Sequence, residues 1–178
     1  MGKYTQVIIL CEDKQQETFA RTFLTSFGAF EKRRINVKKS PTGEGSGEQF
    51  VKNNFSKEVS AYRSKNYLNI CLIAIIDADN HSVDEIRKDL IECLELPLQS
   101  NEKVAIFIPK RNIETWINFI DGNTVDEVTE YPHAAKESEC KMIVKKFSEN
   151  CRNNNTTSGN PPESLKNACI EVRKLIEN

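Results

Sequence analysis

The sequence predicts an α/β fold: an open, mostly parallel sheet with helices on both faces. Three short, largely β-branched apolar runs indicate strands buried on both sides, at residues 7–11, 71–76 and 104–108. Between these runs, apolar residues recur at the three- and four-residue spacing of amphipathic helices. Alternating strands and helices favour a parallel sheet, because each parallel connection needs a crossover that a helix supplies.

Each element has its own local signal. Gly28 closes the first helix, and Ser82-Val83-Asp84-Glu85 is a capping box that opens another. Asn112 is the expected cap of a short helix, and Thr124 to Glu127 is a second capping-box candidate. The expected strands are 7–11, 33–37, 67–76 and 104–108, and the expected helices are 15–27, 50–65, 83–96, 113–120, 134–151 and 162–176, with a glycine-rich loop at 40–47.

The chain length of 178 residues suits one α/β domain of ordinary size. We expect residues 1–132 to form this α/β domain. Residues 133–178 lack a strand signal and are expected to form a C-terminal helical extension packed on it.

Composition limits the compartment and the class of function. The net charge of −1 argues against a protein that coats nucleic acid by bulk electrostatics, although it leaves room for a nuclease with local phosphate contacts. No apolar run spans a bilayer and no signal peptide is recognised, so we expect a cytoplasmic protein without membrane association. All six cysteines are accordingly expected as reduced thiols. A zinc site from His133, Cys140, Cys151 and Cys169 is conceivable, but its spacing matches no common pattern.

Acidic residues stand where the predicted strands end. Glu12 follows the first strand, Asp77 and Asp79 follow the third, and Glu114 lies shortly after the fourth. Because they are two residues apart in an extended segment, Asp77 and Asp79 should lie on the same side. If the first and third strands are neighbours, we expect Glu12 to lie close to both. Carboxylates that converge at a partly buried edge repel one another unless a cation neutralises them, and Mg²⁺ or Mn²⁺ suits oxygen ligands. The alternative is that these acids cap helices or form plain turns.

The arrangement resembles the topoisomerase–primase (Toprim) domain, and most closely the overcoming-lysogenization-defect nucleases and small Toprim-like proteins of phage-defence loci. The resemblance covers roughly residues 5 to 120. Its motifs stand here as Ile8-Ile9-Leu10-Cys11-Glu12, Ile75-Ile76-Asp77-Ala78-Asp79 and Ile108-Pro109-Lys110-Arg111-Asn112-Ile113-Glu114-Thr115-Trp116. Asp13 replaces the usual glycine, and Glu17 is displaced by about one residue, which leaves one-metal chemistry or a degenerate site open.

The resemblance implies a Toprim/Rossmann-like sheet and a role for each acid. Asp77 and Asp79 would hold Mg²⁺ or Mn²⁺, with Glu12 as general acid/base or further ligand. Glu114 is a candidate to complete the coordination, with a favourable first-turn helix acid as the alternative. Lys110 and Arg111 would neutralise a phosphate, or else form a solvated loop pair. Trp116 is expected in the core.

The leading hypothesis is therefore a metal-dependent nuclease acting on DNA or RNA, with an ATPase partner implied by the resemblance. The local nucleic-acid footprint would come from Arg33, Arg34, Lys38 and Lys39, in addition to Lys110 and Arg111. The Gly43–Gly47 loop is either a phosphate contact or a flexible connector. Two other functions stay open: a phospho-acceptor receiver with Asp77 as acceptor, and a Toprim adaptor that binds metal poorly.

Overall fold

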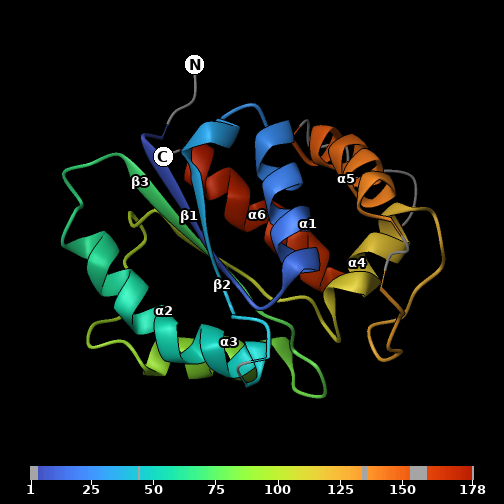
Figure 1. Cartoon of the computed structure of the whole chain (residues 1–178), viewed down its shortest axis with the longest axis horizontal. Helices are drawn as coiled ribbons and strands as arrows, with labels where there is room; N and C mark the ends of the chain where they lie inside the picture. The colour runs from blue at the N-terminus through green and yellow to red at the C-terminus, as the bar shows by residue number, and fades with distance from the viewer. Residues whose placement is uncertain (1–3, 44, 134–135, 153–159, 178) are drawn as a thin grey trace.

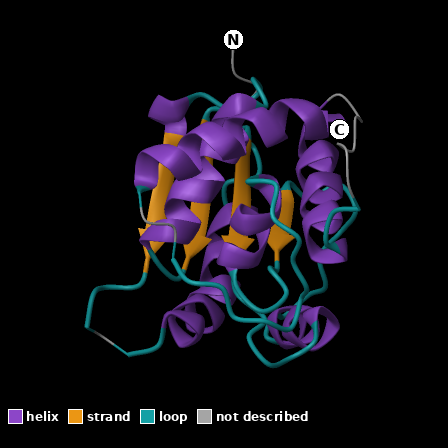
Figure 2. Ribbon diagram, turned by 90° about the vertical axis from the view of Figure 1, so that its right-hand side faces the viewer, coloured by secondary structure: helices purple, strands orange, loops and turns teal. Residues whose placement is uncertain are grey.

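The computed structural model describes residues 4–43, 45–133, 136–152 and 160–177. In this part of the chain the sheet has four parallel strands in the order β2-β1-β3-β4. The strands are β1 (Gln6–Cys11), β2 (Ile35–Lys39), β3 (Ile70–Ile75) and β4 (Val104–Phe107). Figure 2 shows the arrows of the sheet pointing the same way, which confirms the open parallel α/β fold predicted from the sequence.

Six α-helices and one short 3₁₀ helix accompany the sheet in the described residues. They are α1 (Lys14–Ser26), η1 (Lys32–Arg34), α2 (Gly47–Arg63), α3 (Val83–Glu92), α4 (Ile113–Ile120), α5 (Glu137–Arg152) and α6 (Glu163–Glu177). None of the helices in this part of the chain combines the length and apolar character needed to cross a bilayer.

Strand alternation divides the core into two clusters, one on each face of the sheet. In β1, Val7 and Ile9 pack with α1, α4, α5 and α6, whereas Ile8 and Leu10 pack with α2 and α3. Both sets are buried, which explains why β1 reads as a continuous apolar run rather than an alternating one. Figure 1 shows α2 and α3 together on one side of the sheet and the remaining helices on the other.

The C-terminal helices contribute to the main core. Val144 and Phe147 of α5 and Leu165 and Val172 of α6 belong to the same buried cluster as Val7 and Ile9. Trp116 of α4 is fully buried there, as predicted, and its indole N–H donates to Ser164 Oγ at 2.8 Å. The face of the sheet opposite α2 and α3 is thus covered jointly by elements from both ends of the chain.

Several predicted boundaries need correction. The helix predicted to reach residue 96 ends at Glu92, and Cys93 is its C-cap residue. The second strand begins at Ile35 rather than residue 33, since η1 occupies Lys32–Arg34. Residues 124–127 form no helix: the Asp126 carboxylate instead accepts hydrogen bonds from the backbone N–H groups of Val128 and Thr129, as in an Asx turn. The Ser82 capping box and the Asn112 cap are confirmed.

The expectation of six reduced thiols is also wrong for one pair. Cys151 of α5 and Cys169 of α6 form a disulfide across a sequence separation of 18 residues, whereas Cys11, Cys71, Cys93 and Cys140 are free. Both members of the pair are nearly inaccessible to solvent. The pairing also removes two of the four residues considered as zinc ligands.

Reduction of this disulfide should destabilise the fold, because a cross-link over a loop of this length contributes about 3 kcal/mol through the unfolded chain. We expect the thermal midpoint to fall in dithiothreitol, and Cys169→Ser to show the same lowered midpoint with or without reductant. Cys93→Ser is the matched control, since Cys93 is exposed and unpaired. An unchanged midpoint on reduction would show that the cross-link is absent in solution.

Candidate acidic site at the carboxyl edge of the sheet

Glu12 and Asp77 meet at the carboxyl edge of the sheet because β1 and β3 are neighbours. Leu10 pairs with Ala74 in the parallel register, so the residues that follow the two strands emerge side by side. The backbone N–H of Asp77 donates to Glu12 Oε1 at 2.6 Å. The convergence of these two strand ends, predicted on the condition that the strands pair, is confirmed.

The first turn of α1 fixes the Glu12 side chain. Asp13 caps this helix by accepting from the Gln16 backbone N–H at 2.8 Å. The fully buried Gln16 side chain then donates to Glu12 Oε1 at 3.2 Å and accepts from the Glu12 backbone N–H at 2.9 Å. The sequence reasoning did not single out Gln16, although Asp13-x-x-Gln16 has the spacing of a capping box.

Gly47, the first residue of α2, lies against the other side of Glu12. A Cβ atom placed on Gly47 would stand 2.7 Å from Glu12 Cβ and 3.2 Å from Glu12 Cα, so no larger residue fits without a shift. Ser46 caps α2 through the backbone N–H of Gln49. The N-terminus of α2, which follows the glycine-rich loop, therefore lies against the acidic edge of the sheet. The positive end of the helix dipole is at this N-terminus.

The environment of Asp77 disfavours its negative charge. Its Oδ1 atom is buried and has no hydrogen-bond partner among the described residues. Burial raises the pKa of Asp77 well above its usual range, and the nearby carboxylates of Glu12, Glu114, Asp13 and Asp79 raise it further. Burial likewise raises the pKa of Glu12 to about 7, against the opposing effect of its hydrogen bonds from Asp77 and Gln16.

The segment after β3 is tied to the segment after β4. The backbone N–H groups of Ala78 and Asp79 donate to the carbonyl oxygens of Pro109 and Arg111, each at 2.9 Å. Asp79 has a φ of 48° and is exposed, so it lies in a turn. The prediction that Asp77 and Asp79 share one side of an extended segment is therefore wrong, because the strand geometry ends before Asp79.

Lys110 and Arg111 lie beside this turn but have partners. The Lys110 ammonium donates to the backbone carbonyl of His81. The Arg111 guanidinium contacts the side chains of Asn80 and Glu130. Both cations thus contact the residues that directly follow Asp79, and a phosphate would have to compete with these contacts.

The Glu114 carboxylate contacts a histidine from the segment before α5. This carboxylate, on the first turn of α4, is buried and contacts His133 Nδ1. Burial raises the pKa of Glu114, and His133 opposes that effect. The same His133 nitrogen lies 3.0 Å from Gln15 Oε1. Sequence reasoning considered His133 only for zinc, and its contact with Glu114 had no sequence signal.

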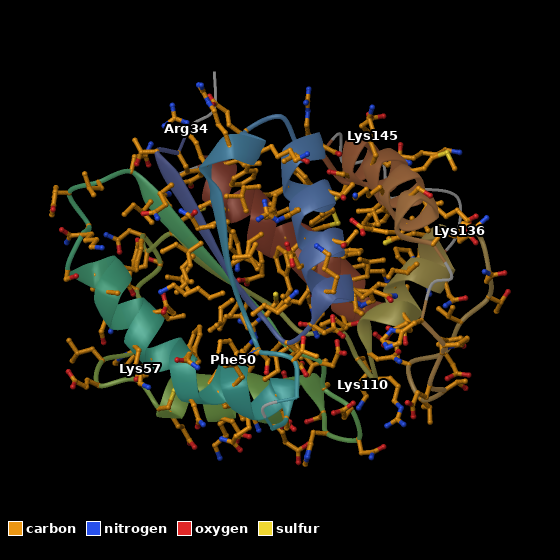
Figure 3. All side chains as sticks on the ribbon, in the orientation of Figure 1. Arg34, Phe50, Lys57, Lys110, Lys136 and Lys145 are labelled. Carbon is orange, nitrogen blue, oxygen red and sulfur yellow. A yellow bond between two sulfur atoms is a disulfide. The ribbon has the colours of Figure 1, made fainter. Side chains whose placement is uncertain are left out.

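The predicted nucleic-acid-binding residues of η1 and β2 do not form one surface with Lys110. Arg33 and Arg34 pair with Glu31 at the amino edge of the sheet, and Figure 3 shows Arg34 and Lys110 at opposite sides of the molecule. Lys38 and Lys39 are nearer the carboxyl edge. Lys38 pairs with Glu58 at 2.6 Å, and Lys39 pairs with Glu17 at 3.3 Å.

Among the described residues, no three His, Cys, Asp or Glu side chains are gathered in an arrangement that could hold a metal ion. A metal ion at the acidic edge would therefore have to draw the carboxylates together. The donor chemistry still suits a hard cation, because Glu12, Asp77 and Asp79 supply only oxygen ligands. One of these oxygens, Asp77 Oδ1, is buried with no hydrogen-bond partner among the residues that the structure describes.

Comparison of the chain with protein-family models, with curated proteins and with solved structures finds no match.

The raised pKa of Glu12 predicts a stability that falls as pH rises in metal-free buffer. Between the ordinary value of 4.5 and about 7, native Glu12 keeps a proton that the unfolded chain has lost. Folding takes up that proton, so raising the pH across this window disfavours the native state by at most about 3 kcal/mol. Denaturant unfolding across this pH range should show that the unfolding free energy of Glu12→Gln depends less on pH than that of wild type. Glu92→Gln, at an exposed position, should keep the wild-type slope, and an equally steep Glu12→Gln profile would contradict the assignment.

Gly47→Ala tests the close approach of α2 to Glu12. The added methyl group must displace the Glu12 backbone or the helix, and we expect a loss of about 1–3 kcal/mol in unfolding free energy. Gln49→Ala, on the exposed side of the same helix turn, serves as control and should lose less than about 1 kcal/mol. Equal stability of Gly47→Ala and wild type would mean that the gap is wider than described.

Proposed function

We propose that the chain is a Mg²⁺- or Mn²⁺-dependent nuclease that cleaves phosphodiester bonds in DNA or RNA. The observation that carries the proposal is the Asp77 carboxylate. Its buried Oδ1 has no hydrogen-bond partner in the part of the chain that the structure describes, and the Asp77 backbone N–H donates to the neighbouring Glu12 carboxylate. Buried, unpaired carboxylates that raise one another's pKa represent a free-energy cost that a divalent cation removes.

Three side chains are suited to hold the ion: Asp77, Asp79 and Glu12. An ion bound there would polarise a phosphoryl oxygen and activate water. Glu114, the fourth ligand candidate, contacts His133 instead and is left out of this proposal.

The chain's own residues would supply proton transfer and charge compensation. A carboxyl group with a pKa of about 7 exchanges protons readily at neutral pH, which fits Glu12 as general acid or base. Lys110 and Arg111 would meet a phosphate at the end of β4 once it displaces their present contacts. The beginning of α2, which Gly47 brings against Glu12, adds a partial positive charge on the other side of the acids.

The receiver alternative is less well supported by the fold. It requires a fifth parallel strand, and the described residues contain four. It also requires a lysine that is free to contact the phosphorylated aspartate, whereas Lys110 is bound to the His81 carbonyl. The ATPase partner implied by the Toprim resemblance, a cytoplasmic location and the adaptor alternative stay predictions.

The nuclease proposal predicts metal-dependent cleavage that depends on the two aspartates. We expect Asp77→Asn and Asp79→Asn to reduce cleavage of labelled single- and double-stranded DNA and RNA at least about 100-fold in Mg²⁺ or Mn²⁺. Asp84→Asn, an exposed acid on α3, is the matched control and should retain wild-type activity.

A binding measurement separates a failed substrate choice from a failed site. Millimolar Mn²⁺ should raise the thermal midpoint of wild type and not of Asp77→Asn, because an ion that binds the native state stabilises it. Stabilisation without cleavage of any polymer would contradict the nuclease. Absence of both effects would contradict the metal site itself and support the adaptor.

A further inference from the structure

A pocket of about 290 Å³ lies next to the acidic edge, between the first turn of α1 and the first turn of α5. Its walls come from Asp13, Lys14 and Gln15 on one side and from His133 and Glu137 on the other. Thr18 and Cys140, both almost fully buried, also line it. Asp13 directly follows Glu12, so the pocket and the proposed catalytic acids share a border.

The imidazole of His133 is held in a fixed orientation at this pocket. Its Nδ1 atom contacts two oxygen acceptors, one from Glu114 and one from Gln15. In the tautomer with its hydrogen on Nδ1, the ring donates toward these oxygens and its Nε2 atom is an acceptor. The side chain is 73% exposed, so a flat aromatic ring of set orientation is open to contact.

Gln15 contributes a buried amide donor to this pocket. Its Oε1 faces His133, which leaves the amide Nε2 buried and without a hydrogen-bond partner among the described residues. A desolvated donor of this kind costs free energy until an acceptor reaches it. The pocket thus combines an unsatisfied donor, an available acceptor and a flat ring.

These groups fit a nucleobase better than a phosphate. Asp13 and Glu137 flank the pocket, with the Glu114 carboxylate behind His133, and their charge opposes an anion more than Lys14 attracts it. A base is neutral, offers donors and acceptors along one edge, and stacks on aromatic rings including histidine. A volume of about 290 Å³ lies at the small end of ligand pockets, which suits a single base.

We propose that this pocket binds one unstacked base of the nucleic acid, in the nucleotide next to the phosphodiester cleaved at the acidic edge. Gln15 donates to the base, His133 stacks on it or accepts from it, and Asp13 connects this subsite to Glu12. The inference rests on the proposed function, because it assigns the substrate a single-stranded or locally opened form at the point of cleavage.

The test uses uncharged nucleosides, which isolate base binding from phosphate and metal binding. The full chain in EDTA is titrated with adenosine, guanosine, cytidine and uridine and followed by saturation-transfer NMR. We expect at least one nucleoside to bind with a dissociation constant on the order of 1 mM. Gln15→Leu should weaken that binding about tenfold, whereas Gln49→Leu, an exposed glutamine in the first turn of α2, should leave it within twofold.

A second pair of variants distinguishes loss of the base-binding pocket from misfolding and from failure of the nuclease proposal. His133→Ala removes an exposed ring and should also weaken nucleoside binding, while Asp77→Asn should retain it. The inference is overturned if no nucleoside binds, even where the chain cleaves nucleic acid, or if Gln15→Leu and His133→Ala bind as wild type does. Nucleoside binding that depends on Gln15, in a chain that cleaves no polymer, would overturn the nuclease proposal alone.

Discussion

The hydrogen bond from the Asp77 backbone to the Glu12 carboxylate ties together the two strand ends on which the site is built. It exists because β1 and β3 are adjacent and in register, and it brings an acidic side chain toward a second acid. The backbone N–H group satisfies one Glu12 oxygen, yet Oδ1 of the Asp77 carboxylate is buried and finds no hydrogen-bond partner within the described ranges of the chain. The geometry of the sheet thus places two mutually repelling carboxyl groups side by side. The apolar packing on both faces of the sheet must offset this unfavourable interaction.

Three surrounding elements restrict how that interaction can relax. Gln16 holds Glu12 from α1, Gly47 closes the space on the α2 side, and the backbone bonds of Ala78 and Asp79 hold the Asp77 turn against the end of β4. Since Glu12 is confined from these sides, protonation or a cation is the available route to lower the repulsion. Carboxyl groups held close together in this way are typical of functional sites, where a prearranged charge lowers the local stability of the fold.

The sequence was sufficient to predict the parallel sheet and the meeting of Glu12 with Asp77, because both follow from buried strand runs and from the shared edge of parallel strands. The sequence was insufficient for the features that depend on contacts between distant elements. The pairing of Glu114 with His133 joins residues on separate elements, and the disulfide between Cys151 and Cys169 depends on how α5 and α6 pack. The ion pairs of Lys38 and Lys39 with Glu58 and Glu17 likewise have no local pattern, so a basic cluster in sequence became a set of neutralised pairs.

The part of the chain after residue 120 completes the environment of the site. Ser164, at the start of α6, accepts from the Trp116 indole and from the Lys110 backbone N–H, and its hydroxyl donates to Glu127. This single hydroxyl links the loop after β4, the helix that carries Glu114 and the connection that leads to His133. Because α6 is packed in the main core, the positions of Lys110, Glu114 and His133 relative to the acids depend on C-terminal residues that lie outside the acidic edge. A chain cut at residue 120 would lose the Ser164 contacts and the His133 contact to Glu114. The acidic edge and its neighbouring pocket therefore depend on the longer chain.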